Sequence, residues 1–101
     1  MSSDRRSETR HYGRVRISWP VVVKADRGVF EMETVDVSPV GAKVRPYEPL
    51  EAGTMALLDF RPPEGEPLGV RAMVWRTDPD GLVFFFMGGR IGDLLLAAHP
   101  L

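Results

Sequence analysis

Short apolar runs recur along most of this chain, some of them with a repeat of two residues, and tight-turn signals separate them. Val15, Ile17 and Trp19 alternate with polar residues, which is typical of a half-buried strand. Asp78-Pro79-Asp80-Gly81 predicts a hairpin, because proline presets φ and glycine accepts a positive φ. No strand–helix–strand alternation is present, which argues against a parallel sheet. The sequence therefore predicts an all-β chain of antiparallel strands.

We expect about six strands and one C-terminal helix. The predicted strands are residues 15–24, 29–35, 42–46, 55–60, 68–76 and 82–87, and the predicted helix is residues 91–98. Pro20 interrupts the first strand, which suits an edge or a bend. Such strands form an antiparallel barrel or a sandwich. Closure into a barrel, with the helix over one opening, hides the strand edges.

The length of 101 residues allows one domain with a single core, and a hydrophobic fraction of 44% supports folding. There is no cysteine, so disulfides and thiolate metal sites are excluded and a reducing compartment is favoured. The N-terminus lacks the apolar core of a signal peptide, and no apolar run approaches the roughly 20 residues of a membrane span. We expect a soluble, cytoplasmic protein.

Positive charge is concentrated at the N-terminus. Residues 1–16 contain five arginines and two acidic residues, a net charge of +3, whereas the other residues carry eight basic and twelve acidic side chains. A local arginine cluster on an otherwise acidic domain suits a small anionic ligand better than a long nucleic acid, which needs a basic face. The alternative for residues 1–9 alone is a solvated tail.

Two polar stretches flank the first hairpin and are the candidate binding residues. Arg10 and Arg14 lie four residues apart before the first strand, and an arginine fork can bond guanine O6 and N7 or phosphate oxygens. Asp36 can accept hydrogen bonds from the opposite guanine edge, and Ser38 can bond a phosphate or a ribose hydroxyl. Gly41 leaves room for a ligand to approach the backbone. Without the arginines, the second stretch would be interpreted as an ordinary turn.

The order Arg10-x-x-x-Arg14, a strand, a hairpin and Asp36-x-Ser38-x-x-Gly41 resembles the paired signature of PilZ domains, which are bacterial receptors for cyclic di-GMP. The resemblance covers nearly the whole chain. It implies a six-stranded PilZ-type β-barrel over residues 15–101, preceded by a flexible basic arm, residues 1–14. It also implies that the arm wraps over the nucleotide and becomes ordered, while the second stretch holds the ligand from the barrel surface.

Residues upstream of the first motif arginine bear on the number of nucleotides. In this family an arginine just before that position favours an intercalated pair of nucleotides, and here the residue is Thr9. The resemblance therefore favours a single nucleotide. Arg5 and Arg6 are additional candidate ligands, and a frame that uses Arg6 and Arg10 stays open. We prefer Arg10 and Arg14, because Arg14 directly precedes the strand.

The leading hypothesis is a non-enzymatic receptor for cyclic di-GMP that signals to a separate effector protein, in processes such as motility or biofilm formation. A ligand-independent PilZ-like adaptor in pilus or motility machinery is the alternative. A barrel for single-stranded nucleic acid is disfavoured, because basic and aromatic residues are not interleaved along a strand. No catalytic constellation, metal cluster or cofactor motif is found. We expect a monomer or weak dimer, with Trp19 and Trp75 in the core or on its rim.

Overall fold

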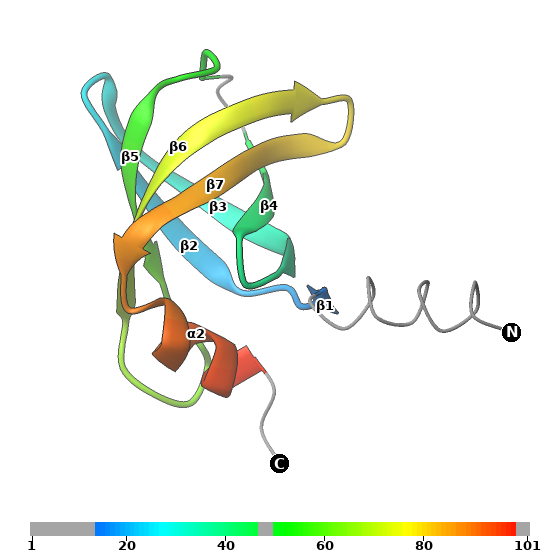
Figure 1. Ribbon diagram of the computed structural model, residues 1–101, viewed down its shortest axis with the longest axis vertical. Helices are drawn as coiled ribbons and strands as arrows, with labels where there is room; N and C mark the ends of the chain where they lie inside the picture. The colour runs from blue at the N-terminus through cyan, green and yellow to red at the C-terminus, as the bar shows by residue number, and fades with distance from the viewer. Residues whose placement is uncertain (1–13, 47–49, 99–101) are drawn as a thin grey trace, which may run out of the picture.

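Antiparallel strands close into a barrel in the computed structural model of the protein, which describes residues 14–46 and 50–98. The strands are β1 (Val15–Arg16), β2 (Pro20–Ala25), β3 (Gly28–Val37), β4 (Gly41–Arg45), β5 (Met55–Phe60), β6 (Leu68–Asp78) and β7 (Gly81–Gly89), and the helix is α2 (Ile91–Ala98). The strand order is β1-β3-β2-β5-β6-β7-β4, and a further β3–β4 pairing closes six strands into a barrel (Figure 1). The predicted six-stranded antiparallel barrel with one C-terminal helix is confirmed.

The extra strand, β1, arises from a break that we predicted at the wrong place. Residues 15–24 were expected to form one strand interrupted at Pro20, but the chain leaves the ladder at residues 17–19 and Pro20 begins β2. The cause is Thr34 on β3, whose hydroxyl accepts a hydrogen bond from the Trp19 N–H at 2.8 Å and donates one to the Ile17 carbonyl. A side chain thus satisfies backbone groups that a regular ladder would pair.

The barrel interior follows directly from the alternation in the sequence. Inward-facing side chains from all six barrel strands are buried, whereas their neighbours face out. The largest fully buried hydrophobic side chains are Phe60, Phe84, Leu58, Leu82, Leu94, Val21, Val23, Val37, Val44, Val70 and Val74. Thr34 is the one buried polar residue in the described part of the chain, and its hydrogen bonds explain why it is tolerated there.

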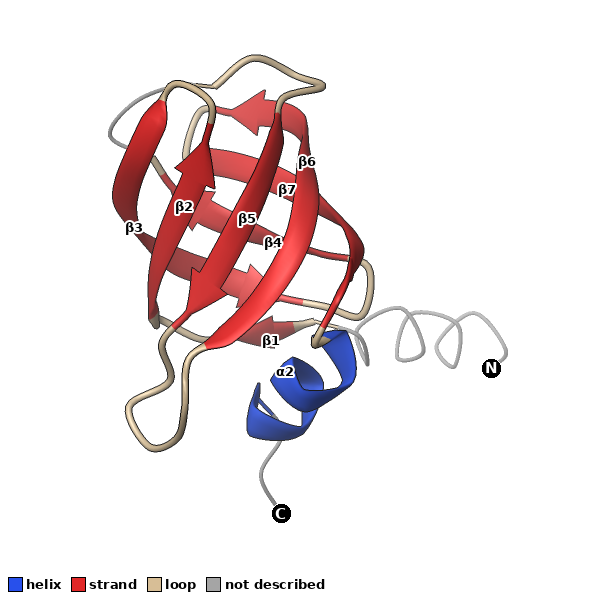
Figure 2. Ribbon diagram, turned by 90° about the vertical axis from the view of Figure 1, so that its left-hand side faces the viewer, coloured by secondary structure: helices blue, strands red, loops and turns tan. Residues whose placement is uncertain are grey.

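Helix α2 covers one end of the barrel, next to the loop between β5 and β6 (Figure 2). Its side chains Leu94 and Ala98 are buried. The rings of Phe60 and Phe86 meet edge to face at 6.2 Å in the core. The helix has the predicted bounds and closes the opening that the sequence led us to expect.

Three register shifts interrupt the regular strand pairing. One lies between Arg71 and Ala72 on β6, and the other two are β-bulges on the outer surface. The register of β3 against β4 shifts between Thr34 and Asp36, and that of β6 against β7 shifts between Val74 and Arg76. A bulge places two consecutive side chains on the same face of a sheet. Both bulges adjoin the site described below. β3 is also longer than predicted, so Asp36 lies in a strand and not in a turn.

Candidate functional site

The turn between β3 and β4 is built around the hydroxyl group of Ser38. Ser38 Oγ accepts hydrogen bonds from the N–H groups of Val40 (3.3 Å) and Gly41 (3.2 Å), and donates one to the Gly41 carbonyl at 3.2 Å. The Ser38 N–H donates to the same carbonyl at 2.8 Å. The turn that we weighed as the simpler interpretation is therefore present. Ser38 must exchange one of these bonds before it can bond a ligand directly.

Gly41 is required by the barrel itself. It is buried, and a Cβ at this position would collide with the backbone carbonyl of Phe84 on β7. Its φ is not in the positive range, so glycine is not needed here for a left-handed backbone conformation. The absence of a side chain allows β4 and β7 to approach closely, which brings the Ser38 turn against the β6–β7 wall.

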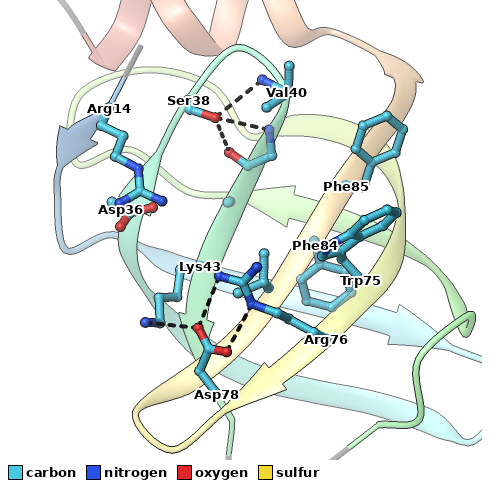
Figure 3. Close-up of a pocket in the computed structure, with 13 residues that line it drawn as sticks. Arg14, Asp36, Ser38, Val40, Lys43, Trp75, Arg76, Asp78, Phe84 and Phe85 are labelled. Carbon is cyan, nitrogen blue, oxygen red and sulfur yellow. Dashed lines mark hydrogen bonds and ion pairs between the residues drawn. The ribbon is translucent and has the colours of Figure 1, made fainter. Parts of the chain in front are cut away.

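One wall of the site comes from the N-terminal strands. Asp36 lies opposite Arg16 on β1 and opposite Lys43 on β4. Arg14, which directly precedes β1, is exposed, and its side chain extends toward Asp36 (Figure 3). The bulge at Val35 leaves Asp36 partly exposed on the outer face. An anionic acceptor thus stands among three cationic side chains.

The opposite wall is aromatic and cationic, and it comes from the second bulge. Trp75 and Arg76 both face outward, with 56% of Trp75 exposed. The Trp75 ring lies 6.0 Å from that of Phe85, tilted by 38°. We expected Trp75 in the core or on its rim and not as a platform for stacking. It lies instead on the outer face of β6, where it offers a flat apolar face to the site.

Ion pairs hold the lower edge of the site, and Figure 3 draws those that Asp78 makes with Arg76 and Lys43. Arg76 Nε bonds Asp78 Oδ1 at 3.0 Å, and Lys43 Nζ lies 3.4 Å from Asp78 Oδ2 and 2.7 Å from Asp80 Oδ1. The hydrogen bond to Arg76 lowers the pKa of Asp78, and the one to Lys43 lowers that of Asp80. The bond to Asp80 raises the pKa of Lys43. Lys43, Asp78 and Asp80 are therefore charged at neutral pH.

These walls enclose a hollow of about 390 Å³, within the size range of small-molecule sites. Residues that line it are Arg14, Asp36, Ser38, Val40, Gly41, Ala42, Lys43, Trp75, Arg76, Asp78, Val83, Phe84 and Phe85. A neighbouring hollow of about 440 Å³ shares Arg14, Asp36 and Lys43 with it. Donors for an anion, an acceptor for N–H groups and an aromatic face are thus combined in one place. This combination suits a phosphorylated heterocycle.

Four of the predicted site residues, Arg14, Asp36, Ser38 and Gly41, line this single hollow. Arg5, Arg6 and Arg10 lie outside the described residues. Lys43, Trp75 and Arg76 were missed as site residues. The signal for the last two was the run Trp75-Arg76-Thr77, which breaks the alternation of Val70, Ala72 and Val74 and so marks a bulge. Lys43 carries no comparable local signal.

Within residues 14–46 and 50–98, no helix is long and apolar enough to cross a membrane. The same residues contain no group of three or more histidine, cysteine or acidic side chains that could hold a metal ion.

Comparison with known proteins agrees with the fold and with the family resemblance. The family model described as PilZ domain matches residues 4–97. No curated protein sequence matches significantly. A solved structure of the PilZ domain of CeSA from a cellulose-synthesizing bacterium aligns with a TM-score of 0.64 and 22% identity, covering 83% of this chain and 89% of that one.

The Bacillus subtilis inhibitor of motility, MotI/DgrA, aligns with a TM-score of 0.67 and 18% identity. The alignment covers 85% of this chain and 46% of that one, so the chain spans less than half of MotI/DgrA. At these identities the two structures support the fold. The family match extends over nearly the whole chain, and the chain belongs to the PilZ domain family.

Proposed function

We propose that this PilZ domain is a receptor for cyclic di-GMP, whose two guanosines are joined by two anionic phosphodiesters. The observation that carries the proposal is the convergence of Arg14, Asp36 and Ser38 on one hollow beside the exposed ring of Trp75. Arg14 would bond a phosphate or the guanine O6 and N7 acceptors. Asp36 would accept from the guanine N1–H and amino group, and Trp75 would stack on a base.

In this proposal the arm, residues 1–14, would fold over the ligand on the open side of the hollow. Arg10 would join Arg14 on the ligand, with Arg5 and Arg6 as further cations. Charge-assisted hydrogen bonds would offset the entropy lost when the arm becomes ordered. The change at residues 9–15 would be the signal that a separate effector protein senses. Thr9 favours one nucleotide per domain.

Calorimetric titration with cyclic di-GMP, with cyclic di-AMP and GTP as controls, tests the proposal. We expect saturable binding at micromolar or lower concentration, selective for cyclic di-GMP. Arg14→Ala should weaken binding at least tenfold, because it removes a charge-assisted contact. Arg27→Ala, an exposed arginine in the β2–β3 turn outside the hollow, is the matched control and should bind normally. No heat from a folded wild-type domain would refute the receptor.

One observation favours the adaptor as the second candidate. Met55, Met73, Phe85 and Met87 lie on the outer face of β5, β6 and β7, and Met55 is paired with Met73, which is paired with Phe85. Methionine-rich outer faces adapt readily to protein partners. A domain that binds an effector equally well with and without cyclic di-GMP would support this candidate.

A further inference from the structure

Arg76 is an exposed arginine that is already paired inside the hollow. Its side chain is 57% exposed, and its Nε and Nη2 atoms lie 3.0 and 3.5 Å from the two carboxylate oxygens of Asp78. In a regular strand Arg76 would point into the barrel, since Trp75 points out. The bulge between Val74 and Arg76 turns both side chains outward into the same hollow. The β6 strand therefore presents a flat ring and a guanidinium fork from adjacent positions.

The negative charge of Asp78 is not balanced by Arg76 alone. Lys43 Nζ lies 3.4 Å from Asp78 and 2.7 Å from Asp80, so both carboxylates keep a cationic neighbour if Arg76 moves away. Exposed ion pairs contribute little net free energy, whereas loss of the last partner of a desolvated charge is costly. Arg76 can therefore leave Asp78 for another hydrogen-bond acceptor at a small cost in free energy.

The position beside Trp75 indicates which acceptor that is. A purine stacked on the indole would present an edge to a neighbouring side chain in the plane of the base. Guanine offers two acceptors there, O6 and N7, which match an arginine fork, whereas adenine replaces O6 with an amino donor. Arg76 is therefore suited to distinguish guanine from adenine and not only to attract negative charge.

We propose that Arg76 is an exchangeable base-reading arginine, which leaves Asp78 for the O6–N7 edge of a guanine stacked on Trp75 while Lys43 retains Asp78 and Asp80. This inference rests on the proposed cyclic di-GMP function. It adds a specificity determinant on the wall opposite the Arg14 and Asp36 motifs. Asp78 then acts as a positioning residue that competes with the ligand for Arg76.

The test compares cyclic di-GMP with its 7-deaza analogue, which lacks the N7 acceptor but keeps both phosphates. The wild type should prefer cyclic di-GMP by about tenfold, and Arg76→Ala should weaken cyclic di-GMP binding and shrink that preference several-fold. Arg61→Ala is the matched control, since Arg61 is 51% exposed, pairs at 3.0 Å with an aspartate two residues away, Asp59, and lies outside the hollow. Arg61→Ala should change neither the affinity for cyclic di-GMP nor the preference over the 7-deaza analogue.

Asp78→Asn provides an independent variant that does not remove Arg76. It should tighten cyclic di-GMP binding a few-fold by releasing the arginine, and the gain should vanish in the Asp78→Asn/Arg76→Ala double variant. Asp80→Asn is the control, because it also removes a negative charge beside Lys43. Asp80 has no bond to Arg76 in the described structure, so this variant should give a smaller gain in affinity for cyclic di-GMP.

The outcomes separate the two proposals. A folded wild type that does not bind cyclic di-GMP overturns the receptor and this inference together. Wild-type binding with an unchanged preference in Arg76→Ala overturns the inference alone. Equal weakening of both nucleotides in that variant also overturns it, because Arg76 would then contact phosphate and not the base.

Discussion

Thr34 replaces a backbone partner of Trp19, since the Trp19 N–H donates to the Thr34 hydroxyl at 2.8 Å while the Thr34 N–H donates to the Trp19 carbonyl at 2.8 Å. The same hydroxyl donates to the Ile17 carbonyl. This double link ends β1 and redirects the chain into β2. It thereby fixes where β1 lies on β3, and hence where Arg14 meets the candidate site.

Thr34→Val should therefore destabilise the domain. The substitution keeps the shape but leaves the Trp19 N–H and the Ile17 carbonyl without their partner, at a cost of about 1–3 kcal/mol. Urea denaturation measures the free energy of unfolding. Thr77→Val on the exposed face of β6 is the control and should change it by less than about 0.5 kcal/mol. An equal effect of both variants would contradict the role of Thr34.

Regular periodicity explains what the sequence predicted well. Strand β5 and helix α2 have the predicted bounds, because β5 is a short apolar run between turn residues and the apolar residues of α2 repeat every 3.6 residues. The errors fall where side chains replace backbone pairing or where strands bulge. The break at residues 17–19 depends on Thr34, which is distant in sequence, and no local pattern encodes it.

The residues of the candidate site also fall into those that local patterns predicted and those that depend on the tertiary fold. Arg14, Asp36, Ser38 and Gly41 form local motifs, and the structure brings them to one hollow. Lys43 joins them only because β4 pairs with both β3 and β7, a consequence of barrel closure. The packing role of Gly41 was not predicted, since close packing of two strands is a tertiary requirement.

Gly41→Ala should reduce stability and not only ligand binding. The added Cβ meets the Phe84 carbonyl, and the backbone cannot yield as a flexible side chain would, so we expect a loss of about 1–3 kcal/mol. Gly92→Ala in α2 is the matched control, because nothing lies within 4 Å of its Cβ. Alanine there should stabilise the helix by about 0.5–1 kcal/mol. Thermal unfolding of both variants tests this contrast.

Stability should fall in acid partly through Asp78. Its pKa is lowered from the ordinary value of 3.8, chiefly by the hydrogen bond from Arg76, so its contribution is complete above pH 3.8 and disappears as the pH falls through the lower folded value. The free energy of unfolding should therefore drop more steeply below pH 4 for the wild type than for Asp78→Asn. Parallel curves for the two proteins would show that the ion pair contributes nothing.

The contribution of Lys43 to stability has the opposite pH dependence, because it is lost at alkaline pH. Its pKa is raised above 10.5, chiefly by the hydrogen bond to Asp80, so its contribution is complete below pH 10.5 and declines as the pH rises through the folded value. The stability difference between the wild type and Lys43→Met should thus be constant near neutrality and shrink at high pH. A difference that does not change with pH would instead indicate lost packing of the lysine stem.

Trp75 should report ligand binding by fluorescence. The chain has two tryptophans, Trp19 with 6% exposure and Trp75 with 56%, and Trp75 alone lines the hollow. Stacking of a guanine should quench Trp75, so cyclic di-GMP should reduce the emission of the wild type and of Trp19→Phe. Trp75→Phe should bind nearly as well without a fluorescence change.

Trp75→Ala should lose about 1–3 kcal/mol of binding free energy, which is the usual contribution of base stacking on an aromatic ring. Full quenching in Trp75→Phe would place the ligand near Trp19 and away from this hollow, and would contradict the site proposed for the nucleotide.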